Sequence, residues 1–129
     1  MKLKGYIGKI LRVDLSGSKV RVEDLNEEWA QQFIGGSGLG AKFLYEMTDE
    51  RTNPLGPENP LIFMTGPFTG TSVPLSGRHA VVSRSPLTGI FGESDVGGTW
   101  GANLKKAGFD GMIITGKSQK PVYLWAHEG

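Results

Sequence analysis

The residues best suited to chemistry lie in a glycine-rich stretch between residues 66 and 101. Arg78 carries a guanidinium that can hold a phosphate through two parallel hydrogen bonds. Gly97 and Gly98 come directly before a predicted helix, where glycine lets an anion approach free backbone N–H groups and the positive end of the helix. Asp95 would repel a phosphate unless Mg²⁺ bridged the two. The stretch therefore predicts a phosphate or pyrophosphate cradle.

Each residue of the predicted cradle has its own role. Arg78 would clamp the phosphate, and Asp95 would be the metal ligand. The backbone of Val96, Gly97 and Gly98 would donate hydrogen bonds to the anion. A plainer interpretation is also open, in which Arg78 and Asp95 form a surface ion pair and the glycines only mark the start of a helix. The residues alone do not choose between the two.

Two other glycine motifs resemble nucleotide-binding loops but stand in the wrong context. Residues 111–118 satisfy the P-loop pattern, yet their variable positions are a strand-like run, and Pro121 would interrupt the helix that must follow. Residues 36–40 resemble part of a dinucleotide-binding motif, but a predicted helix precedes them instead of a strand. We interpret residues 36–40 as a closely packed corner between two helices, with a ligand role as the alternative.

The sequence contains no cysteine and only two histidines, His79 and His127. This composition excludes thiol catalysis and an iron–sulfur cluster held by this chain, and no complete set of catalytic residues is recognisable. His79 fits a strand interior better than a ligand position. Glu93 and Asp95 would share one face of a strand, which leaves a hydrolase with two carboxylates open as an alternative.

Charge and hydropathy limit the partners. The 14 Lys and Arg residues nearly balance the 13 Asp and Glu residues, giving a net charge of +1, which argues against nucleic acid or an anionic membrane as a partner. The longest apolar run, residues 61–64, is far shorter than the roughly 20 residues that span a bilayer. Because no signal-peptide core is recognisable, we expect a cytoplasmic protein.

Hairpins and short helices are expected to position the cradle. Alternation over residues 9–15, a turn at residues 16–17 and renewed alternation to residue 22 predict an N-terminal hairpin. Asn26 is expected to cap one helix and Ser37 a second, with a third short helix over residues 99–107. Further strands are predicted over residues 61–65, 79–83, 112–115 and 122–126. The order favours an α+β fold, a mostly antiparallel sheet with two to three helices, in a single domain over residues 1–129.

Several blocks of this sequence resemble the tungsten-containing aldehyde:ferredoxin oxidoreductase family. The blocks follow one another through the chain at residues 8–16, 33–42, 65–71, 77–78, 85–89, 97–98, 105–110 and 116–117. The resemblance implies the first part of the family's N-terminal, pterin-binding domain, which is a duplicated α+β domain.

The resemblance also implies cofactors and partners. In that family two pterin molecules hold tungsten, or molybdenum in relatives, through their dithiolenes, and Mg²⁺ bridges the pterin phosphates. A 4Fe-4S cluster passes electrons to ferredoxin. Residues at the positions of Arg78, Asp95 and Gly97 are associated with the phosphates and the magnesium, which supports the cradle. We therefore expect part of an enzyme that oxidises aldehydes to carboxylates, with ferredoxin and the remainder of the enzyme chain as partners.

The sequence departs from the family pattern at two positions. The family usually has Asn where Asp95 stands, and commonly Arg where Ser37 stands. Its cluster cysteines lie further along the chain, so we expect these 129 residues alone to be inactive. The alternative is a non-catalytic interaction module, or an isolated fragment, that keeps the fold without the cofactor. Such a module would pair with a partner, or with itself as a homo-oligomer, through exposed strand edges.

Overall fold

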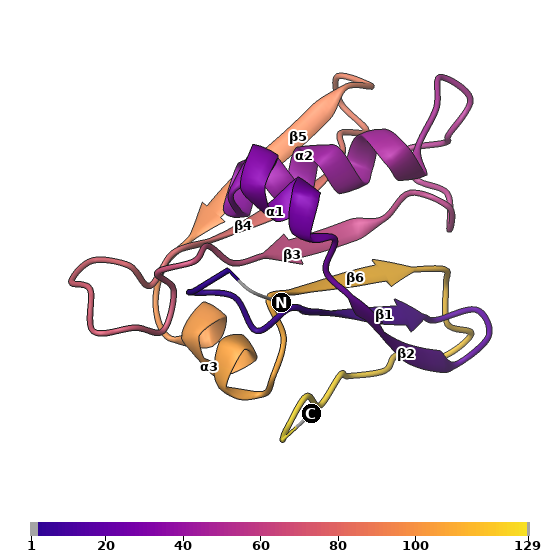
Figure 1. Ribbon diagram of the computed structural model, residues 1–129. Helices are drawn as coiled ribbons and strands as arrows, with labels where there is room; N and C mark the ends of the chain where they lie inside the picture. Colours follow the sequence, from indigo (N-terminus) through magenta and orange to yellow (C-terminus); the bar gives the residue numbers. More distant parts are fainter. Residues whose placement is uncertain (1–2, 129) are drawn as a thin grey trace.

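Six strands form one mixed sheet in the computed structural model, which describes residues 3–128 (Figure 1). The strands are β1 (Lys9–Asp14), β2 (Lys19–Asp24), β3 (Leu61–Met64), β4 (His79–Arg84), β5 (Phe91–Val96) and β6 (Gly111–Thr115). Their order across the sheet is β2-β1-β6-β3-β4-β5. Within the described residues, β1 and β6 pair in parallel and the other four neighbouring pairs are antiparallel. The expected α+β fold with a mostly antiparallel sheet is confirmed.

Three helices accompany the sheet: α1 (Glu27–Phe33), α2 (Gly36–Met47) and α3 (Trp100–Lys106). The predicted cap of α1 is confirmed, because the Asn26 side chain accepts a hydrogen bond of 3.0 Å from the Trp29 amide. The predicted cap of α2 is wrong. Gly35 is its N-cap, without a side-chain hydrogen bond, and the Ser37 hydroxyl instead donates to Glu93 on β5.

The helices divide between the two faces of the sheet, as Figure 1 shows for α1 and α2 over β3, β4 and β5. Successive residues of a strand point to opposite faces, so Ile10 and Ile113 pack with α2 while their neighbours Leu11 and Met112 pack with α3. The core under α1 and α2 consists of Ile10, Leu25, Ala30, Leu39, Phe43, Leu44, Ile62, Met64, Ala80, Val82 and Ile113. A smaller cluster on the other face includes Leu104 and Phe109.

The sequence prediction of strands is correct for five of the six. It missed β5, whose residues are almost all exposed because the strand lies at the edge of the sheet. It was wrong for residues 122–126, which alternate like a strand but form no ladder with any residue between 3 and 128. Residues 111–115 form β6, and no helix follows them in the described chain, which fits the rejection of a P-loop. Within residues 3–128, none of the helices has the length and apolar character needed to cross a bilayer.

Candidate functional site

Arg78 and Asp95, the two charged residues of the predicted cradle, line the same pocket of about 310 Å³. We name it the corner pocket, because the turn between α1 and α2 forms one wall. Its lining residues are Ile34, Gly35, Gly36, Ser37, Gly66, Pro67, Arg78, His79, Ala80 and Asp95. The pocket therefore joins the ends of β4 and β5 to the start of α2.

The pairing of β4 with β5 places Arg78 and Asp95 together. Ala80 and Asp95 are direct partners in the antiparallel ladder, so their side chains share the face that α2 covers. Arg78 precedes Ala80 by two residues and lines the pocket from the same end of β4. Both charged side chains are exposed, so each is free to meet a ligand entering from solvent.

The start of α2 forms one wall of the pocket, on the face of the sheet that this helix covers. Gly35, Gly36 and Ser37 line the pocket, and α2 runs for 12 residues away from them. The positive end of α2 therefore lies at this pocket, while the Gly36 amide donates to the Thr65 carbonyl and the Gly38 amide to the Gly35 carbonyl.

The closely packed corner expected over residues 36–40 is present at Gly40, where a Cβ would lie 2.8 Å from a Val82 methyl group. The adjoining Gly35 packs as well, since a Cβ there would lie 2.7 Å from the Thr65 carbonyl oxygen. The place of this corner in the pocket depends on the packing of α2 against β4 and on the Gly36–Thr65 hydrogen bond, which are tertiary contacts.

The predicted backbone donors lie at the margin of this pocket. The residues that line the pocket do not include Val96, Gly97 or Gly98, although the preceding residue, Asp95, does line it. A Cβ at Gly77 would lie 2.9 Å from the carbonyl oxygen of Gly98, so the chain before Arg78 contacts the chain after Asp95. The structure thus brings Gly98 next to the Arg78 segment, while the helix that faces the pocket is α2 and not α3.

Gly66 and Gly97 are glycines for which the described residues give no packing reason. Neither has a backbone φ in the left-handed range. A Cβ at Gly66 would meet only the Thr69 hydroxyl at 3.7 Å, and a Cβ at Gly97 would meet nothing within 4 Å. A residue without a side chain in open space is the expected arrangement where a ligand approaches the backbone closely.

His79 lies next to Arg78 in sequence, but its ring points to the opposite face of the sheet. The histidine is 4% exposed, and its ring packs with those of Trp100 and Phe63, whose centroids are 4.8 Å and 6.4 Å away. Its Nδ1 atom has no hydrogen-bond partner within residues 3–128. Burial lowers the pKa of His79, and the negative charge of Asp95 opposes that shift. The expectation of a strand-interior histidine is confirmed.

The acidic residues of the site do not form a metal centre by themselves. Glu93 and Asp95 share a face of β5, and Glu93 accepts the Ser37 hydroxyl. Among residues 3–128 there is no group of three or more His, Asp or Glu side chains that could hold an ion. A magnesium ion at Asp95 would need most of its ligands from water and from the bound anion, which is the usual manner of Mg²⁺.

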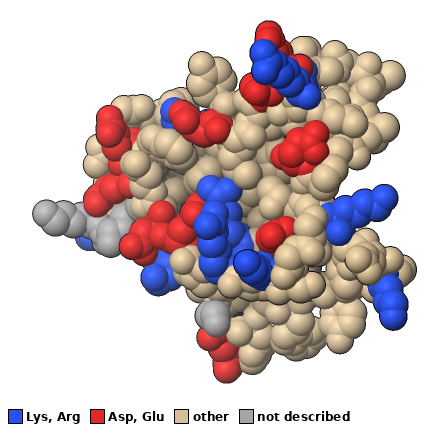
Figure 2. Space-filling model, turned by 90° about the vertical axis from the view of Figure 1, so that its right-hand side faces the viewer, with Lys and Arg blue, Asp and Glu red and all other residues tan. Residues whose placement is uncertain are grey.

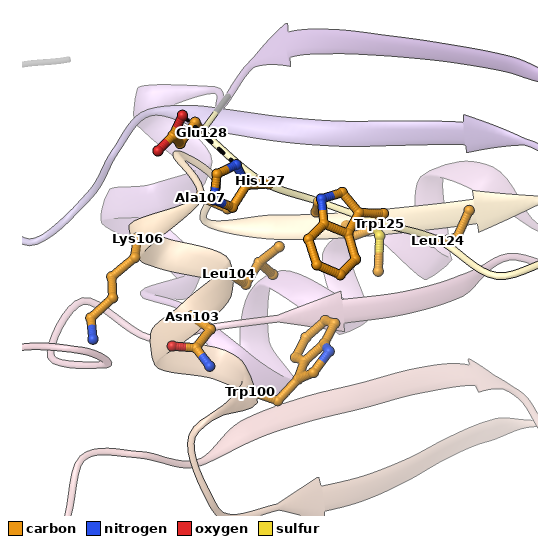
Figure 3. Close-up of a pocket in the computed structure, with 11 residues that line it drawn as sticks. Trp100, Asn103, Leu104, Lys106, Ala107, Leu124, Trp125, His127 and Glu128 are labelled. Carbon is orange, nitrogen blue, oxygen red and sulfur yellow. Dashed lines mark ion pairs between the residues drawn. The ribbon is translucent and has the colours of Figure 1, made fainter.

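A larger pocket of about 550 Å³ lies between α3 and the C-terminal segment (Figure 3). Trp100 and Trp125 point toward its interior, and the His127 ring lies 3.8 Å from Glu128. Trp125 is 81% exposed, so one wall of this pocket is an open chain segment. We place the candidate site in the corner pocket, because Arg78, Asp95 and the start of the 12-residue helix α2 line it together, whereas the carboxylate of the larger pocket, Glu128, stands on the exposed C-terminal segment.

The surface shown in Figure 2 carries both signs of charge. Lys and Arg side chains there lie among Asp and Glu side chains. Among the ion pairs of the described residues, Arg12 Nε lies 2.7 Å from Glu23 Oε1. The face shown therefore carries no broad field of a single sign of charge.

The structure is an α+β domain whose corner pocket is lined by a guanidinium, a carboxylate and the start of a helix. Residues 10–129 match the family model described as the N-terminal domain of aldehyde ferredoxin oxidoreductase. The chain belongs to this family.

Several named proteins are similar to the chain over almost its whole length. The tungsten-containing aldehyde ferredoxin oxidoreductase of Pyrococcus abyssi is 49% identical over 124 residues, which is 96% of this chain and 20% of that protein. The corresponding enzyme of Pyrococcus horikoshii is 48% identical over the same share. An aliphatic sulfonate oxidoreductase, WOR-like subunit, of Pyrococcus furiosus is 42% identical over 95% of this chain. The chain spans about a fifth of the length of these relatives.

A solved structure agrees with the fold. The active site complex BamBC of benzoyl coenzyme A reductase superposes with a TM-score of 0.94 at 34% sequence identity, over 97% of this chain and 19% of that one. The chain thus corresponds to the N-terminal domain of larger oxidoreductases.

Proposed function

We propose that the corner pocket binds the phosphate end of the pterin cofactor in a tungsten- or molybdenum-dependent oxidoreductase. The observation that carries the proposal is the convergence of Arg78, Asp95 and the first turn of α2 on one pocket. The names of the relatives from Pyrococcus abyssi and Pyrococcus horikoshii, both tungsten-containing enzymes, support the choice of metal.

The residues present fit such a group. Arg78 would form paired hydrogen bonds with a phosphate, and the positive end of α2 would stabilise the same negative charge. Asp95 would hold Mg²⁺ between its carboxylate and the phosphates, which removes the repulsion between the two anions. Gly66 and Gly97 leave the open space that a ligand lying against the backbone requires. The backbone of Val96, Gly97 and Gly98 would contact the part of the cofactor that extends beyond the pocket.

In this proposal the domain itself binds and orients the cofactor. When bound, the metal–pterin group supplies the oxidation of an aldehyde and water to a carboxylic acid, with release of two electrons and two protons. This chain contributes no catalytic side chain to that reaction in our proposal. It has no cysteine, so the 4Fe-4S cluster that would pass the electrons to ferredoxin belongs to the part of the enzyme outside these 129 residues.

The comparisons favour an aldehyde over other substrates. Four aldehyde ferredoxin oxidoreductases share 45% to 49% identity with the chain. The aliphatic sulfonate oxidoreductase subunit shares 42%, and a glyceraldehyde-3-phosphate:ferredoxin oxidoreductase shares 38% over only 79 residues. The difference in sequence identity between these groups of relatives is small. We therefore propose the aldehyde class without naming a particular aldehyde.

The test is the metal content of the purified full-length protein. Arg78→Ala removes the guanidinium and is expected to lower bound tungsten or molybdenum per chain by roughly tenfold, since a charge-assisted hydrogen bond contributes about 1.5–3 kcal/mol. Arg51→Ala, which removes an exposed guanidinium from the loop after α2, is the matched control and should leave the metal content unchanged.

Two results would overturn the proposal. If Arg78→Ala retains the metal content of the natural protein, the corner pocket does not hold the phosphates. If the natural protein contains neither metal nor pterin, the interaction module considered from the sequence becomes the better account.

A further inference from the structure

The residue at the turn of the corner pocket, Ile34, has a strained backbone. Its φ is +65° and its ψ is −72°. The Gly35 amide donates a hydrogen bond of 2.8 Å back to the Phe33 carbonyl, which closes a three-residue γ-turn around Ile34. A β-branched residue with positive φ is rare, and such a conformation costs about 1–3 kcal/mol. The surrounding structure must hold it in place.

Burial of the isoleucine does not explain the turn. The Ile34 side chain is 61% exposed, so its packing offsets little of the backbone strain. The turn does determine where α2 begins, because the next residues, Gly35 and Gly36, are the N-cap and the first residue of that helix. The Gly36 amide donates to the Thr65 carbonyl over 3.0 Å, which fixes the helix start against the end of β3.

Tyr6 holds the turn from the other side. Its hydroxyl lies 2.7 Å from the Ile34 carbonyl oxygen and 3.2 Å from that of Ala30. Because a phenol has a single hydrogen, the shorter contact, to Ile34, is the main hydrogen bond. Burial and the negative charge of Asp110 raise the pKa of Tyr6 above its usual value of 10.0, so the hydroxyl remains a donor throughout the neutral range.

The segment that carries Tyr6 is itself fixed to the interior. The Asp110 carboxylate accepts the amides of Ile7 and Gly8 over 3.0 Å and 2.6 Å. Lys105 donates to the Gly5 carbonyl over 2.6 Å, and its ammonium lies 5.7 Å from the centre of the Tyr6 ring. The buried Lys105–Asp110 pair thus holds the residues on both sides of Tyr6.

We propose that Tyr6 is a positioning residue for the corner pocket: its hydroxyl holds Ile34 in the γ-turn and so directs the start of α2 toward a bound phosphate. The inference rests on the proposed function of that pocket. It accounts for a strained residue that packing leaves unexplained, and strain of this kind concentrates where a binding site must be held ready.

The test uses two variants of the full-length protein that loosen the turn in different ways. Tyr6→Phe removes the hydrogen bond but keeps the ring, and Ile34→Gly removes the cost of positive φ. Both should increase hydrogen exchange of the amides at residues 35–38 in protein prepared without tungsten or molybdenum. Both should also lower the bound metal after growth with tungsten, by roughly tenfold, the scale seen when an orienting partner is lost.

Stability separates a positioning role from a structural one. Ile34→Gly should leave the unfolding midpoint unchanged or raise it while the metal content falls, a combination that a purely structural residue would not give. Tyr45→Phe, at a tyrosine that is 80% exposed, is the control. It should change neither the hydrogen exchange at residues 35–38, nor the metal content, nor the unfolding midpoint. If Tyr6→Phe gives no folded protein, natural exchange of the amides at residues 35–38 in Ile34→Gly still overturns the inference, because the turn would then not determine where α2 begins.

The outcomes distinguish this inference from the proposed function. Natural exchange rates and natural metal content in both variants, with metal lost in Arg78→Ala, would overturn the role of Tyr6 and leave the pocket's function standing. Full metal content in Arg78→Ala would overturn the function of the pocket, and the exchange rates would still show whether Tyr6 fixes the turn.

Discussion

Lys105 and Asp110 form an ion pair inside the molecule, with 2.7 Å between the Lys105 Nζ and the Asp110 Oδ1. The two side chains are 8% and 2% exposed. The Asp110 carboxylate also accepts hydrogen bonds from the amides of Ile7 and Gly8. In addition, the Thr65 amide and hydroxyl both donate to the Asp110 carbonyl. The pair therefore joins the N-terminal segment, β3 and the end of α3.

Removing one member of this pair is predicted to destabilise the chain strongly. Asp110→Ala would leave the Lys105 ammonium buried without its counter-charge, which costs about 3–5 kcal/mol of unfolding free energy. Urea denaturation followed by circular dichroism measures the change. Asp24→Ala, which breaks the exposed pair with Lys9, should cost less than about 1 kcal/mol. Equal effects of the two substitutions would contradict the structural role of Asp110.

Asp95→Asn is predicted to be tolerated. An amide oxygen can still ligate Mg²⁺, and the loss of one negative charge reduces repulsion of the phosphates. We expect the metal content of the full-length protein to stay within about twofold of natural, while Asp95→Lys, which cannot ligate a cation, lowers it. A hydrolase built on Glu93 and Asp95 would instead lose its activity in Asp95→Asn.

Gly66→Ala is predicted to separate binding from folding. The new methyl group would meet only the Thr69 hydroxyl at 3.7 Å, so stability should change by less than about 0.5 kcal/mol. The same methyl group would occupy part of the corner pocket and lower the retention of tungsten. Metal content and the unfolding midpoint, measured on one preparation, check both halves of this expectation.

Gly40→Ala gives the reverse pattern and serves as the comparison. A Cβ at Gly40 would lie 2.8 Å from a methyl group of Val82, where α2 crosses β4. Because Val82 is fully buried, overpacking should cost about 1–3 kcal/mol of stability. Indistinguishable stability of the two alanine variants would show that the close approach of α2 to β4 is not needed.

The stability of the chain should depend on pH through His79. Because burial lowers its pKa below the unfolded value of 6.5, the unfolded chain binds the proton first as the pH falls. The His79 contribution is therefore constant above about pH 6.5 and is lost as the pH falls through the lowered pKa. His79→Phe keeps an aromatic ring and should remove this dependence, while His127→Gln should retain it. Urea midpoints between pH 5 and 8, about the range in which histidine titrates, provide the measurement.

Local sequence signals predicted most of the elements correctly. Asn26 before two glutamates indicated the start of α1, and alternation indicated the hairpin of β1 and β2, because these signals depend on neighbouring residues only. The edge strand β5 lacks such a signal, since a strand exposed on both faces has no apolar side to reveal it. Residues 122–126 have a strong strand pattern but no ladder partner in the described chain, and pairing is a tertiary property that no local pattern contains.

The site was predictable in part. Arg78 and Asp95 were selected by their chemistry and by the family resemblance, and their common pocket depends on a β4–β5 register that the sequence analysis did not include. Lys105 lies in the last turn of α3 and is buried against Asp110, a contact that no local sequence pattern indicates. The γ-turn at Ile34 could not be foreseen, because an isoleucine is among the last residues expected at positive φ.

The place of β6 in the sheet has a consequence for synthesis of the chain. This strand is the last of the six to leave the ribosome, yet it lies between β1 and β3 and pairs with both. Until residue 115 has emerged, the hairpin of β1 and β2 and the three strands β3 to β5 are two separate pieces with unpaired edges. Contacts so distant in sequence form slowly, and nascent chains of this domain should depend on chaperones until β6 inserts.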